Sequence, residues 1–516
     1  MKGDGRAALE TDADADAEAD VDVAVVGAGP VGMTLAALLG RAGHSVVVCE
    51  RYPGLYGLPR AASLDGEVMR ALQGLGLAAE LAPLLRAQEA YEWRNGAGEL
   101  LSRQVFRDVG ASGWADHYMF HQPDLEDALY GVCAALPNVD MRFGTTVTGL
   151  TQDRDRVTLG TADGATLTAR HAVGCDGGNS FVRHALGIEQ DDLGFSEPWL
   201  VCDLELRRPA VELGLPPMLQ IGDPEGPTTI ITTAAERQRF AFMLDEGDDL
   251  ERERAADRVW ARVSRHLSRD DADIARAATY TFQSLVARRW RAGRVLLAGD
   301  AAHQMPPFLG QGMCAGVRDA LNIAFKLSLV RRGVQDTEVL DTYQSEREPH
   351  VRGVTAMSVE LGREHTLRDP VLARERDTAL KARQATLTEP ERIRLPDPGP
   401  GLFASGGGLL SVQGRVSDGR ATGLLDEIVG GGFRLLVLAE SLPLPDAAAL
   451  TDLGVTVVGF GDTAGGPVVA DLDGTHRRWL TGLGATAAAV RPDHYVYAAG
   501  PDAGEVAHRL RMLLTG

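Results

Sequence analysis

The sequence predicts a mixed α/β protein made of three parts: a domain built on a parallel sheet, a second β-sheet domain interleaved with it, and a separate C-terminal domain. Three observations carry this expectation. An apolar strand, a glycine-rich turn and a helix follow one another near the N-terminal end. Residues 196–284 contain several β-rich runs, and a turn-rich segment at 395–401 precedes a further alternation of strands and helices. The 516 residues, 44% of them hydrophobic and 24% charged, suit a folded chain of several domains.

The charge balance narrows the expected partners. The chain has 52 basic and 72 acidic residues, a net charge of −20. An acidic surface repels phosphate backbones, so no nucleic-acid partner is expected. Residues 1–20 are rich in alternating Ala and Asp, cannot bury a core, and are predicted to form a disordered acidic tail. The uncharged run 23–40 is interrupted by glycines and a proline, which argues against a membrane span.

The five cysteines lie far apart, and none form a pair with metal-ligand spacing. An odd number of widely spaced cysteines fits reduced thiols, so we expect a cytoplasmic protein without a metal site. Nothing in the sequence separates a monomer from a homodimer.

The first glycine motif predicts a nucleotide site. Residues 23–26 form an apolar strand, the stretch Gly27-Ala-Gly29-Pro-Val-Gly32 follows, and a helix and a second strand ending at Glu50 come next. In this context Gly27 permits a tight turn, Gly29 lets the backbone approach a pyrophosphate, and Gly32 lets helix and strand pack closely. Glu50 lies where a carboxylate accepts hydrogen bonds from a ribose. The motif predicts a Rossmann-like domain and leaves FAD and NAD(P) open.

Two later motifs narrow the choice of cofactor. Gly174-Cys-Asp176-Gly177-Gly178 follows an apolar stretch. A buried strand is then predicted to end at Gly299-Asp300, where a carboxylate can accept from a ribityl hydroxyl. The loop 306–312 offers backbone amides at the start of the next helix, which suits the electron-rich edge of a ring.

With these motifs in view, the chain resembles the single-component FAD-dependent aromatic hydroxylases, the class A flavoprotein monooxygenases. Within them it most resembles the 3-(3-hydroxyphenyl)propionate hydroxylase branch, which includes polyketide-tailoring hydroxylases. The resemblance runs from Val21 to about Arg352. It rests on the stretches GAGPVG, PRAASLDGE, FHQPDLE, GCDGGNSFVR, RVLLAGDAAHQMPPFLGQGMCAGVRDALNIAFKL and LDTYQSER.

The resemblance implies FAD as the cofactor and assigns residues to it. Arg60 matches an arginine at the flavin and pyrophosphate, Gln122 a glutamine that contacts FAD, and Asp176 an acid that serves both FAD and NAD(P)H. The chain departs from many relatives at Cys314, where they have asparagine. The predicted cofactor-binding residues are Gly27, Ala28, Gly29, Pro30, Val31, Gly32, Glu50, Arg51, Arg60, Gln122, Asp176, Gly177, Asp300, Pro306, Gly310, Gln311, Gly312 and Met313.

The resemblance also implies the reaction. NAD(P)H reduces the flavin, O2 gives a C4a-hydroperoxide, and an electron-rich phenolic or polycyclic aromatic substrate is hydroxylated, in aromatic catabolism or natural-product tailoring. An FAD-dependent epoxidase or Baeyer–Villiger monooxygenase acting on a polyketide is the alternative. A halogenase is disfavoured because the motif Trp-x-Trp-x-Ile-Pro is absent from the sequence. A flavin-binding interaction protein without chemistry is disfavoured by the complete set of flavin motifs.

The sequence names no catalytic acid or base. His303 is interpreted as structural in the flavin loop, and packing or surface roles are favoured for His117, Tyr118 and His121 over deprotonation of a phenol. Arg237 and Arg239 are available for a substrate carboxylate, or are solvated. The residues proposed to line the substrate site are Trp199, Gln220, Thr229, Ile231, Phe242 and Met243.

These interpretations divide the chain. Residues 21–195 and 285–394 are predicted to form the FAD-binding domain, and 196–284 the substrate-binding sheet domain. Residues 401–516 resemble the thioredoxin-like C-terminal domain of the same branch. No cysteine follows Cys314, so redox activity is excluded for that domain.

Overall fold

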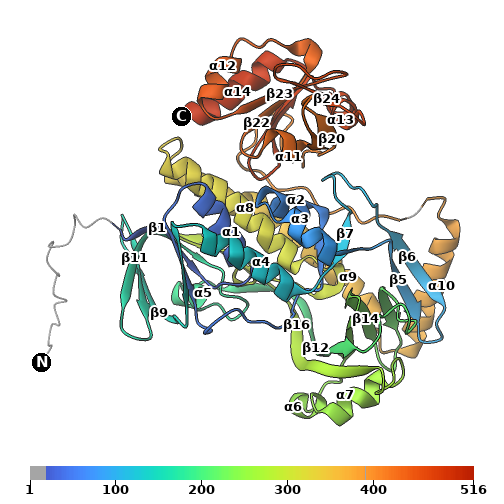
Figure 1. Cartoon of the computed structure of the whole chain (residues 1–516). Helices are drawn as coiled ribbons and strands as arrows, with labels where there is room; N and C mark the ends of the chain where they lie inside the picture. Colours follow the sequence, from blue (N-terminus) through green and yellow to red (C-terminus); the bar gives the residue numbers. More distant parts are fainter. Residues whose placement is uncertain (1–18, 390) are drawn as a thin grey trace, which may run out of the picture.

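A largely parallel sheet forms the centre of the first part of the molecule (Figure 1). The computed structural model describes residues 19–389 and 391–516, so most of the predicted acidic tail lies outside the described residues. Strand β1 (Val21–Val26) pairs in parallel with β2 (Val46–Glu50) on one side and β11 (Thr166–Gly174) on the other. The strand order is β17-β18-β11-β1-β2-β8, and β9 and β10 extend from β11 as an antiparallel hairpin. The other strands are β8 (Val139–Phe143), β9 (Val147–Gln152), β10 (Val157–Thr161), β17 (Arg291–Ala292) and β18 (Val295–Leu297).

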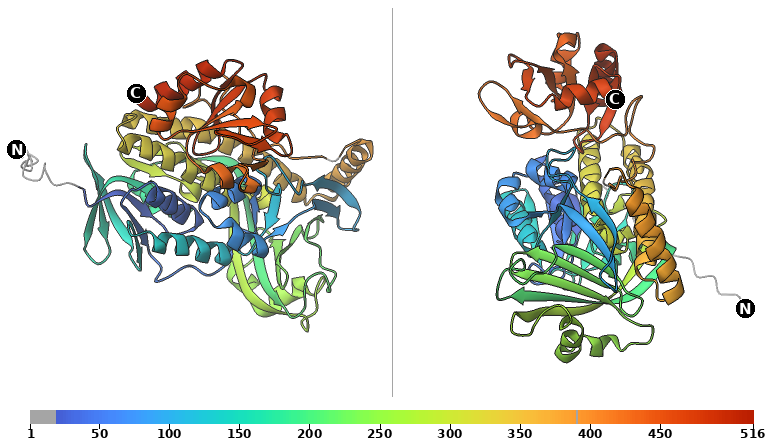
Figure 2. Two further views of the ribbon diagram at one scale, coloured as in Figure 1. Left: turned by 45° about the horizontal axis from the view of Figure 1, so that its top comes forward. Right: turned by 90° about the vertical axis from the view of Figure 1, so that its right-hand side faces the viewer.

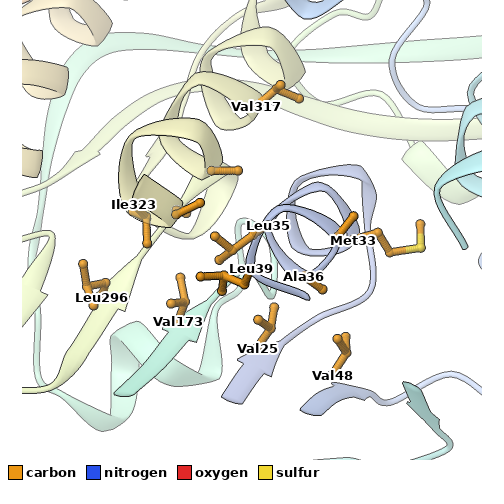
Figure 3. Packing of buried hydrophobic residues seen from close by; sticks show 14 of the residues in the cluster. Val25, Met33, Leu35, Ala36, Leu39, Val48, Val173, Leu296, Val317 and Ile323 are labelled. Atoms are coloured by element: carbon orange, nitrogen blue, oxygen red, sulfur yellow. The ribbon is translucent and has the colours of Figure 1, made fainter. Parts of the chain in front are cut away.

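Helices cover this sheet because its central strands are apolar on both faces. The covering helices are α1 (Pro30–Arg41), α4 (Gln122–Ala135) and α8 (Gly312–Arg331). In Figure 3, Leu35 of α1 lies among Val173 of β11 and Ile323 of α8, and all three side chains are buried. The core of this domain therefore joins segments that lie more than a hundred residues apart, as expected for a domain interrupted by another.

The second sheet stands beside the first and has the order β19-β16-β12-β15-β14-β13-β5-β6. Its strands are β5 (Ala90–Asn95), β6 (Leu100–Val105), β12 (Gln190–Leu206), β13 (Met218–Gly222), β14 (Thr228–Ala234), β15 (Arg237–Met243), β16 (Ala272–Ala287) and β19 (His303–Gln304). The predicted range 196–284 thus accounts for its middle only. β5 and β6 come from far upstream, and β5 pairs in parallel with β13. The sequences of β5 and β6 are short and contain charged residues, so by themselves they do not clearly predict strands.

The strand registers give this sheet two different faces. On the outer face, Leu200, Phe240 and Phe242 form a buried cluster with Val259 and Trp260 of helix α7 (Ala256–Val263). The inner face is turned toward helix α9 (Asp341–His365) and the first domain. Because side chains alternate along a strand, the neighbours of the outer residues, such as Trp199 and Met243, belong to the inner face.

The C-terminal part is a separate layered domain at the top of Figure 1. Its sheet has the order β21-β20-β24-β23-β22-β25-β26, with β22, β23 and β24 parallel to one another and β25 and β26 antiparallel. Apolar clusters lie on both faces of the sheet. Its elements are β20 (Arg415–Ser417), β21 (Thr422–Leu424), α11 (Leu425–Val429), β22 (Arg434–Leu438), α12 (Ala447–Asp452), β23 (Thr456–Gly461), β24 (Val468–Asp471), α13 (Thr475–Gly482), β25 (Ala487–Val490), β26 (Val496–Gly500) and α14 (Ala503–Thr515).

Buried ion pairs fasten this domain to the first one. Arg70 of α2 lies 2.7 Å from Asp426 of α11, and both side chains are buried. Arg491 lies 2.8 Å from Glu346 of α9, also buried. Figure 2 shows the C-terminal domain, drawn in red, next to the helices drawn in yellow, and Phe325 and Leu329 of α8 pack into its apolar cluster. The predicted mixed α/β fold with a third domain is confirmed.

Smaller elements complete the described chain. They are β3 (Ser63–Asp65), α2 (Gly66–Gly74), α3 (Ala78–Leu81), η1 (Ala82–Leu84), β4 (Arg86–Ala87), β7 (His117–Met119), α5 (Phe181–Ala185), α6 (Leu250–Glu253), η2 (Gly299–Ala301), η3 (Pro307–Leu309), η4 (Thr337–Leu340), α10 (Pro370–Thr386) and η5 (Ala439–Ser441). None of the helices in residues 19–389 and 391–516 combines the length and apolarity needed to cross a membrane.

Candidate flavin and substrate site

The first glycine turn has the geometry of a phosphate cradle. Gly27 has a φ of 106°, and a Cβ there would lie 2.5 Å from the carbonyl oxygen of Cys175. A Cβ on Gly32 would lie 2.0 Å from the carbonyl oxygen of Gly27. Apart from Gly29 itself and its two chain neighbours, no described atom lies within 4 Å of the position that a Cβ on Gly29 would take. The turn is therefore closed toward the protein and open at Gly29, where α1 begins with Pro30 at its first position.

Glu50 ends β2 beside this turn, as predicted. Its Oε2 accepts a hydrogen bond from the backbone N–H of Ala28 at 2.8 Å, and its Oε1 accepts from the N–H of Tyr52 at 3.0 Å. A carboxylate has further acceptor positions, so these bonds orient the group without exhausting it. The guanidinium of the neighbouring Arg51 lies over the ring of Tyr52.

Gln122 positions the segment that contains Arg60. Its side-chain oxygen accepts from the N–H groups of Arg60 at 3.1 Å and Ala61 at 2.6 Å, and its amide nitrogen donates to Glu126 at 2.6 Å. The side chain of Arg60 stacks over the ring of Tyr56 at 4.5 Å. Gln122 thus acts here through the backbone of the 60–61 segment.

The loop after β11 is held by Asp176. Its carboxylate accepts from the hydroxyl of Ser180 at 2.5 Å and from the N–H of Val182 at 3.1 Å. Burial raises the pKa of Asp176, although these hydrogen bonds oppose the shift. Gly177, next in the chain, has a φ of 80°, which favours glycine.

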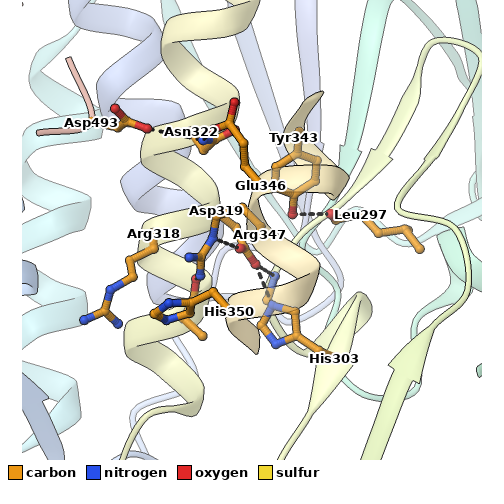
Figure 4. Close-up of polar contacts among 12 residues, drawn as sticks. Leu297, His303, Arg318, Asp319, Asn322, Tyr343, Glu346, Arg347, His350 and Asp493 are labelled. Atoms are coloured by element: carbon orange, nitrogen blue, oxygen red, sulfur yellow. Dashed lines mark hydrogen bonds and ion pairs between the residues drawn. The ribbon is translucent and has the colours of Figure 1, made fainter. Parts of the chain in front are cut away.

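Asp300 lies in the short η2 turn after β18, with an exposed side chain. A buried network supports this turn from below (Figure 4). His303 Nε2 lies 2.6 Å from Asp319, which also accepts from the N–H of Gly299 at 3.1 Å and from Arg347 at 3.0 Å. Burial opposes ionisation of Asp319, but His303 and Arg347 hold its pKa below the usual range. The structural interpretation of His303 therefore has a named partner, Asp319, which the sequence did not single out.

The loop from Pro306 to Met313 is anchored on several sides. The carbonyl of Pro306 accepts from Ser358 of α9 at 2.7 Å. Gly310 has a φ of 65°, and a Cβ there would lie 2.2 Å from Ser63 Oγ. Gln311 accepts from Arg318 at 3.1 Å. Gly312 and Met313 open α8, so the amides of this loop lie at a helix N-terminus as predicted.

Five of the six proposed substrate residues share the inner face of the second sheet. Trp199 pairs with Met243, Gln220 pairs with Thr229, and Ile231 continues the same face of β14. Phe242, the sixth proposed residue, does not lie on this inner face. It packs on the outer face in the cluster with Leu200 and Phe240, because adjacent residues of one strand point to opposite faces.

An aromatic cluster joins this inner face to the flavin loop. Trp199 stacks on Phe282 at a centroid distance of 5.4 Å and meets Phe308 edge-on at 5.9 Å. Phe308 belongs to the loop 306–313. His365, the last residue of α9, stacks on Trp199 at 6.1 Å and meets Phe308 at 5.8 Å. The sequence analysis did not predict Phe308 or His365 as site residues. The position of Phe308 in the loop 306–313 was the one sequence signal that could have indicated its role, and His365 had no such signal.

The arginines of the inner face are committed to other groups. Arg239 lies 2.7 Å from Asp203 and donates to the carbonyls of Arg60 at 2.6 Å and Pro59 at 3.0 Å. Arg276 lies 3.6 Å from the same carboxylate. Arg237 is more exposed and pairs with Glu205 at 3.1 Å. Arg239 therefore ties the sheet to the 59–60 segment, and is neither solvated nor free.

The polar residues near Gln122 have separate surroundings. His117 is buried, stacks on Phe106 at 4.7 Å, and has a pKa lowered by burial to about 4. The hydroxyl of Tyr118 accepts from the N–H of Ala115 at 2.8 Å, and His121 lies 3.0 Å from Asp124. His117 lies near the flavin loop, with its Cε1 atom 3.6 Å from the position that a Cβ on Gly310 would take. These contacts agree with packing and surface roles.

The arrangement as a whole fits a dinucleotide that ends in a flat ring. The open position at Gly29, the carboxylate at the end of β2 and the exposed Asp300 follow the carboxyl edge of the parallel sheet, where nucleotides bind in this fold. The glycines at 310 and 312 then lead to the aromatic cluster. The fold and site define a nucleotide-dependent enzyme in which an aromatic cluster lies against the loop 306–313.

Comparison with known proteins identifies the family. The model of a family described as FAD binding domain matches residues 20–358, and that of the HcaD C-terminal domain matches residues 408–514. The chain belongs to the FAD-dependent aromatic hydroxylases of this family.

Its relatives carry matching descriptions. A probable NADH-specific resorcinol 4-hydroxylase of Rhodococcus jostii (strain RHA1) is 45% identical over 496 residues, which cover 94% of this chain and 92% of that protein. A 3-(3-hydroxy-phenyl)propionate/3-hydroxycinnamic acid hydroxylase of Mycobacterium avium (strain 104) is 34% identical, covering 80% of this chain and 75% of that protein.

Solved structures give the same result. Aklavinone-11 hydroxylase, in a complex with FAD and aklavinone, superposes with a TM-score of 0.75 at 25% identity, covering 97% of this chain and all of that one. The anhydrotetracycline hydroxylase OxyS of Streptomyces rimosus has a TM-score of 0.72 at 26% identity, covering 96% of this chain and 99% of that one. The prediction of an FAD-dependent aromatic monooxygenase with NAD(P)H as co-substrate is confirmed.

Proposed function

We propose that this enzyme hydroxylates a small, uncharged phenol of the resorcinol class and takes its electrons from NADH. One observation carries the choice of substrate: the arginines on the inner face of the sheet already have protein partners. Arg237 pairs with Glu205, while Arg239 and Arg276 share the carboxylate of Asp203 and both donate to the carbonyl of Pro59. A carboxylate-bearing substrate needs a cation to replace its water, since burying an unpaired charge is costly. The aromatic cluster around Trp199 instead suits a neutral ring. The relation to the resorcinol hydroxylase supports both the substrate class and NADH.

The roles that we propose for the predicted cofactor residues follow from their positions. The 27–32 turn with Ala28, Pro30 and Val31 would hold the pyrophosphate, Glu50 the ribose, and Asp300 the ribityl chain. Pro306 and the segment 310–313 would lie along the ring, and Gln122 would act by holding Arg60. Bound FAD supplies the activation of oxygen. The aromatic cluster would orient the substrate and keep water away from it.

Three further predictions from the sequence stay proposals. We take 21–195 with 285–394, 196–284 and 401–516 as the domain limits, with β5 and β6 contributed to the second sheet from outside its limits. We take the enzyme to be cytoplasmic, because its five cysteines are free among the described residues. We expect a monomer or homodimer without nucleic acid, in keeping with the net charge of −20.

The test is a substrate comparison with FAD-loaded protein. Resorcinol should accelerate NADH oxidation far more than 3-(3-hydroxyphenyl)propionate does, and NADH should be preferred to NADPH. With ¹⁸O2, the product should be a benzenetriol with one labelled oxygen. Acceleration by the propionate alone would overturn the proposed substrate class. A labelled oxygen within a new ring ester or an epoxide would replace hydroxylation by the Baeyer–Villiger or epoxidase alternative.

A further inference from the structure

His365 is a buried polar side chain without a protein partner. It ends α9, and its side chain is fully buried. Neither Nδ1 nor Nε2 has a hydrogen-bond partner among the described residues of the chain. A buried polar group that lacks a partner costs free energy on folding, so most such groups are satisfied. The indole N–H groups of the neighbouring Trp93 and Trp199 also have no partner among the described residues. Of these three side chains, only the imidazole can both donate and accept a hydrogen bond.

The walls around this imidazole are aromatic and belong to three different parts of the site. Trp199 comes from the inner face of the sheet, Trp93 from β5, and Phe308 from the flavin loop, with ring centroids 6.1, 6.0 and 5.8 Å from that of His365. The last turn of α9 is pressed against the flavin loop, because a Cβ on Gly362 would lie 2.5 Å from the Phe308 ring. His365 thus lies between the sheet and the loop that would line the flavin.

The imidazole is neutral in this environment. Burial lowers the pKa of His365 to about 3, and the nearby Arg376 adds to the shift. The Arg376 guanidinium is itself bonded to Asp377 and to the carbonyls of Gly222 and Glu364. A neutral imidazole has one N–H donor and one acceptor nitrogen. It can therefore accept from a phenolic hydroxyl or donate to its oxygen, but it offers no positive charge to a carboxylate.

We propose that His365 is a substrate-binding residue that hydrogen-bonds a hydroxyl of the phenol, and that it selects hydroxylated rings over apolar rings of the same shape. This inference rests on the proposed function for its choice of probe. A site that hydrogen-bonds a hydroxyl rejects the analogue without it, because the buried polar group is then left unpaired.

The experiment compares resorcinol with m-xylene, in which methyl groups of similar size replace both hydroxyls. Dissociation constants are measured by perturbation of the flavin spectrum in FAD-loaded protein. In His365→Phe, resorcinol should bind about 10- to 100-fold more weakly, as for the loss of a buried hydrogen bond, while the affinity for m-xylene stays within about twofold. His365→Gln, which keeps a donor and an acceptor, should restore part of the affinity for resorcinol.

A matched control uses the opposite face of the same sheet. His266 stacks on Phe240 in the outer cluster at 5.6 Å, so His266→Phe should leave both dissociation constants unchanged. If His365→Phe weakens resorcinol and m-xylene equally, or weakens neither, the assignment is overturned and the residue only shapes the fold. If the wild type hydroxylates another phenol instead of resorcinol, the proposed substrate fails. The same comparison with that phenol and its methyl isostere then decides the role of His365.

Discussion

At the scale of single residues, the site depends on glycines at which a Cβ atom would clash with neighbouring atoms. Gly27 and Gly32 face backbone oxygens, and Gly310 faces Ser63. These positions could be read from the sequence, because only glycine combines a positive φ or close packing with an adjacent strand and helix. The buried hydrogen-bond partners of the site could not be predicted from the sequence. Asp319 and His303 are 16 residues apart, and nothing in the chain marks them as a pair.

Gly32→Ala should abolish most FAD binding. The new Cβ would lie 2.0 Å from a backbone oxygen that cannot move without opening the turn. The expected loss is about 5- to 150-fold in FAD affinity, corresponding to the 1–3 kcal/mol of an overpacked site. Fluorescence titration of the apoprotein with FAD measures it.

Gly131→Ala is the control for this variant. Gly131 lies in α4 and is exposed, and apart from its chain neighbours and the nearby backbone of its own helix no described atom lies within 4 Å of its Cβ position. Alanine there should leave FAD affinity unchanged and raise stability by up to about 1 kcal/mol. Equal FAD affinity of Gly32→Ala and the wild type would contradict the cradle geometry.

At the scale of elements, α9 links the site to the rest of the molecule. Its side chains reach the flavin loop through Ser358, the His303 network through Arg347, and the aromatic cluster through His365. The sequence indicated the helices and strands of the nucleotide domain well, because strand, turn and helix are adjacent in the chain. It missed β5 and β6 in the second sheet and placed Phe242 with Met243, because pairing and facing are decided by strand register across long separations.

Gly362→Ala should disturb the flavin loop through α9. The new methyl would meet the rings of Phe308 at 2.5 Å and Phe195 at 2.9 Å. Overpacking of this kind costs about 1–3 kcal/mol, which corresponds to a roughly 5- to 150-fold fall in kcat/KM if the loop moves. Substrate-dependent NADH oxidation and the fraction of NADH lost to H2O2 measure the effect. Unchanged rates and unchanged coupling of NADH oxidation to hydroxylation would show that the loop tolerates the added methyl group. The control is Ala356→Gly, at an exposed position of the same helix.

At the scale of the whole molecule, the C-terminal domain is joined to the first domain through buried charges. Glu346 of α9 lies 2.9 Å from Lys326 of α8 and 2.8 Å from Arg491, and accepts from the N–H of Leu402 at 2.7 Å. Asn322 of α8 donates to Glu346 at 2.8 Å and to Asp493 at 3.2 Å. One carboxylate thus serves both domains, and the interface depends on its charge.

Glu346→Gln should destabilise the protein strongly. The change leaves Lys326 and Arg491 with less negative charge in a buried site, and breaking such a pair costs about 3–5 kcal/mol. Thermal unfolding and limited proteolysis in the 395–401 segment measure it, with a lower Tm and faster cleavage expected. Glu440→Gln is the control, since Glu440 forms an exposed pair with Arg477 at 2.8 Å and should change stability by less than about 1 kcal/mol. Similar Tm changes for the two variants would contradict the role of Glu346 at the interface.

The same carboxylate should give the protein a characteristic loss of stability in acid. Burial alone would raise the pKa of Glu346, but Arg491 and Lys326 lower it from 4.5 to about 2. A carboxyl group with a lower pKa in the folded than in the unfolded state stabilises the fold fully above the unfolded pKa, and this contribution disappears as the pH falls toward the folded pKa. The contribution of Glu346 is therefore present at neutral pH and declines from about pH 4.5 downward.

The wild type should lose more Tm than Glu346→Gln between pH 5 and pH 3, because the variant has no proton to bind at this position. Parallel Tm curves for the two proteins in this range would contradict the assignment, whereas converging curves would support a charged Glu346 at the domain interface.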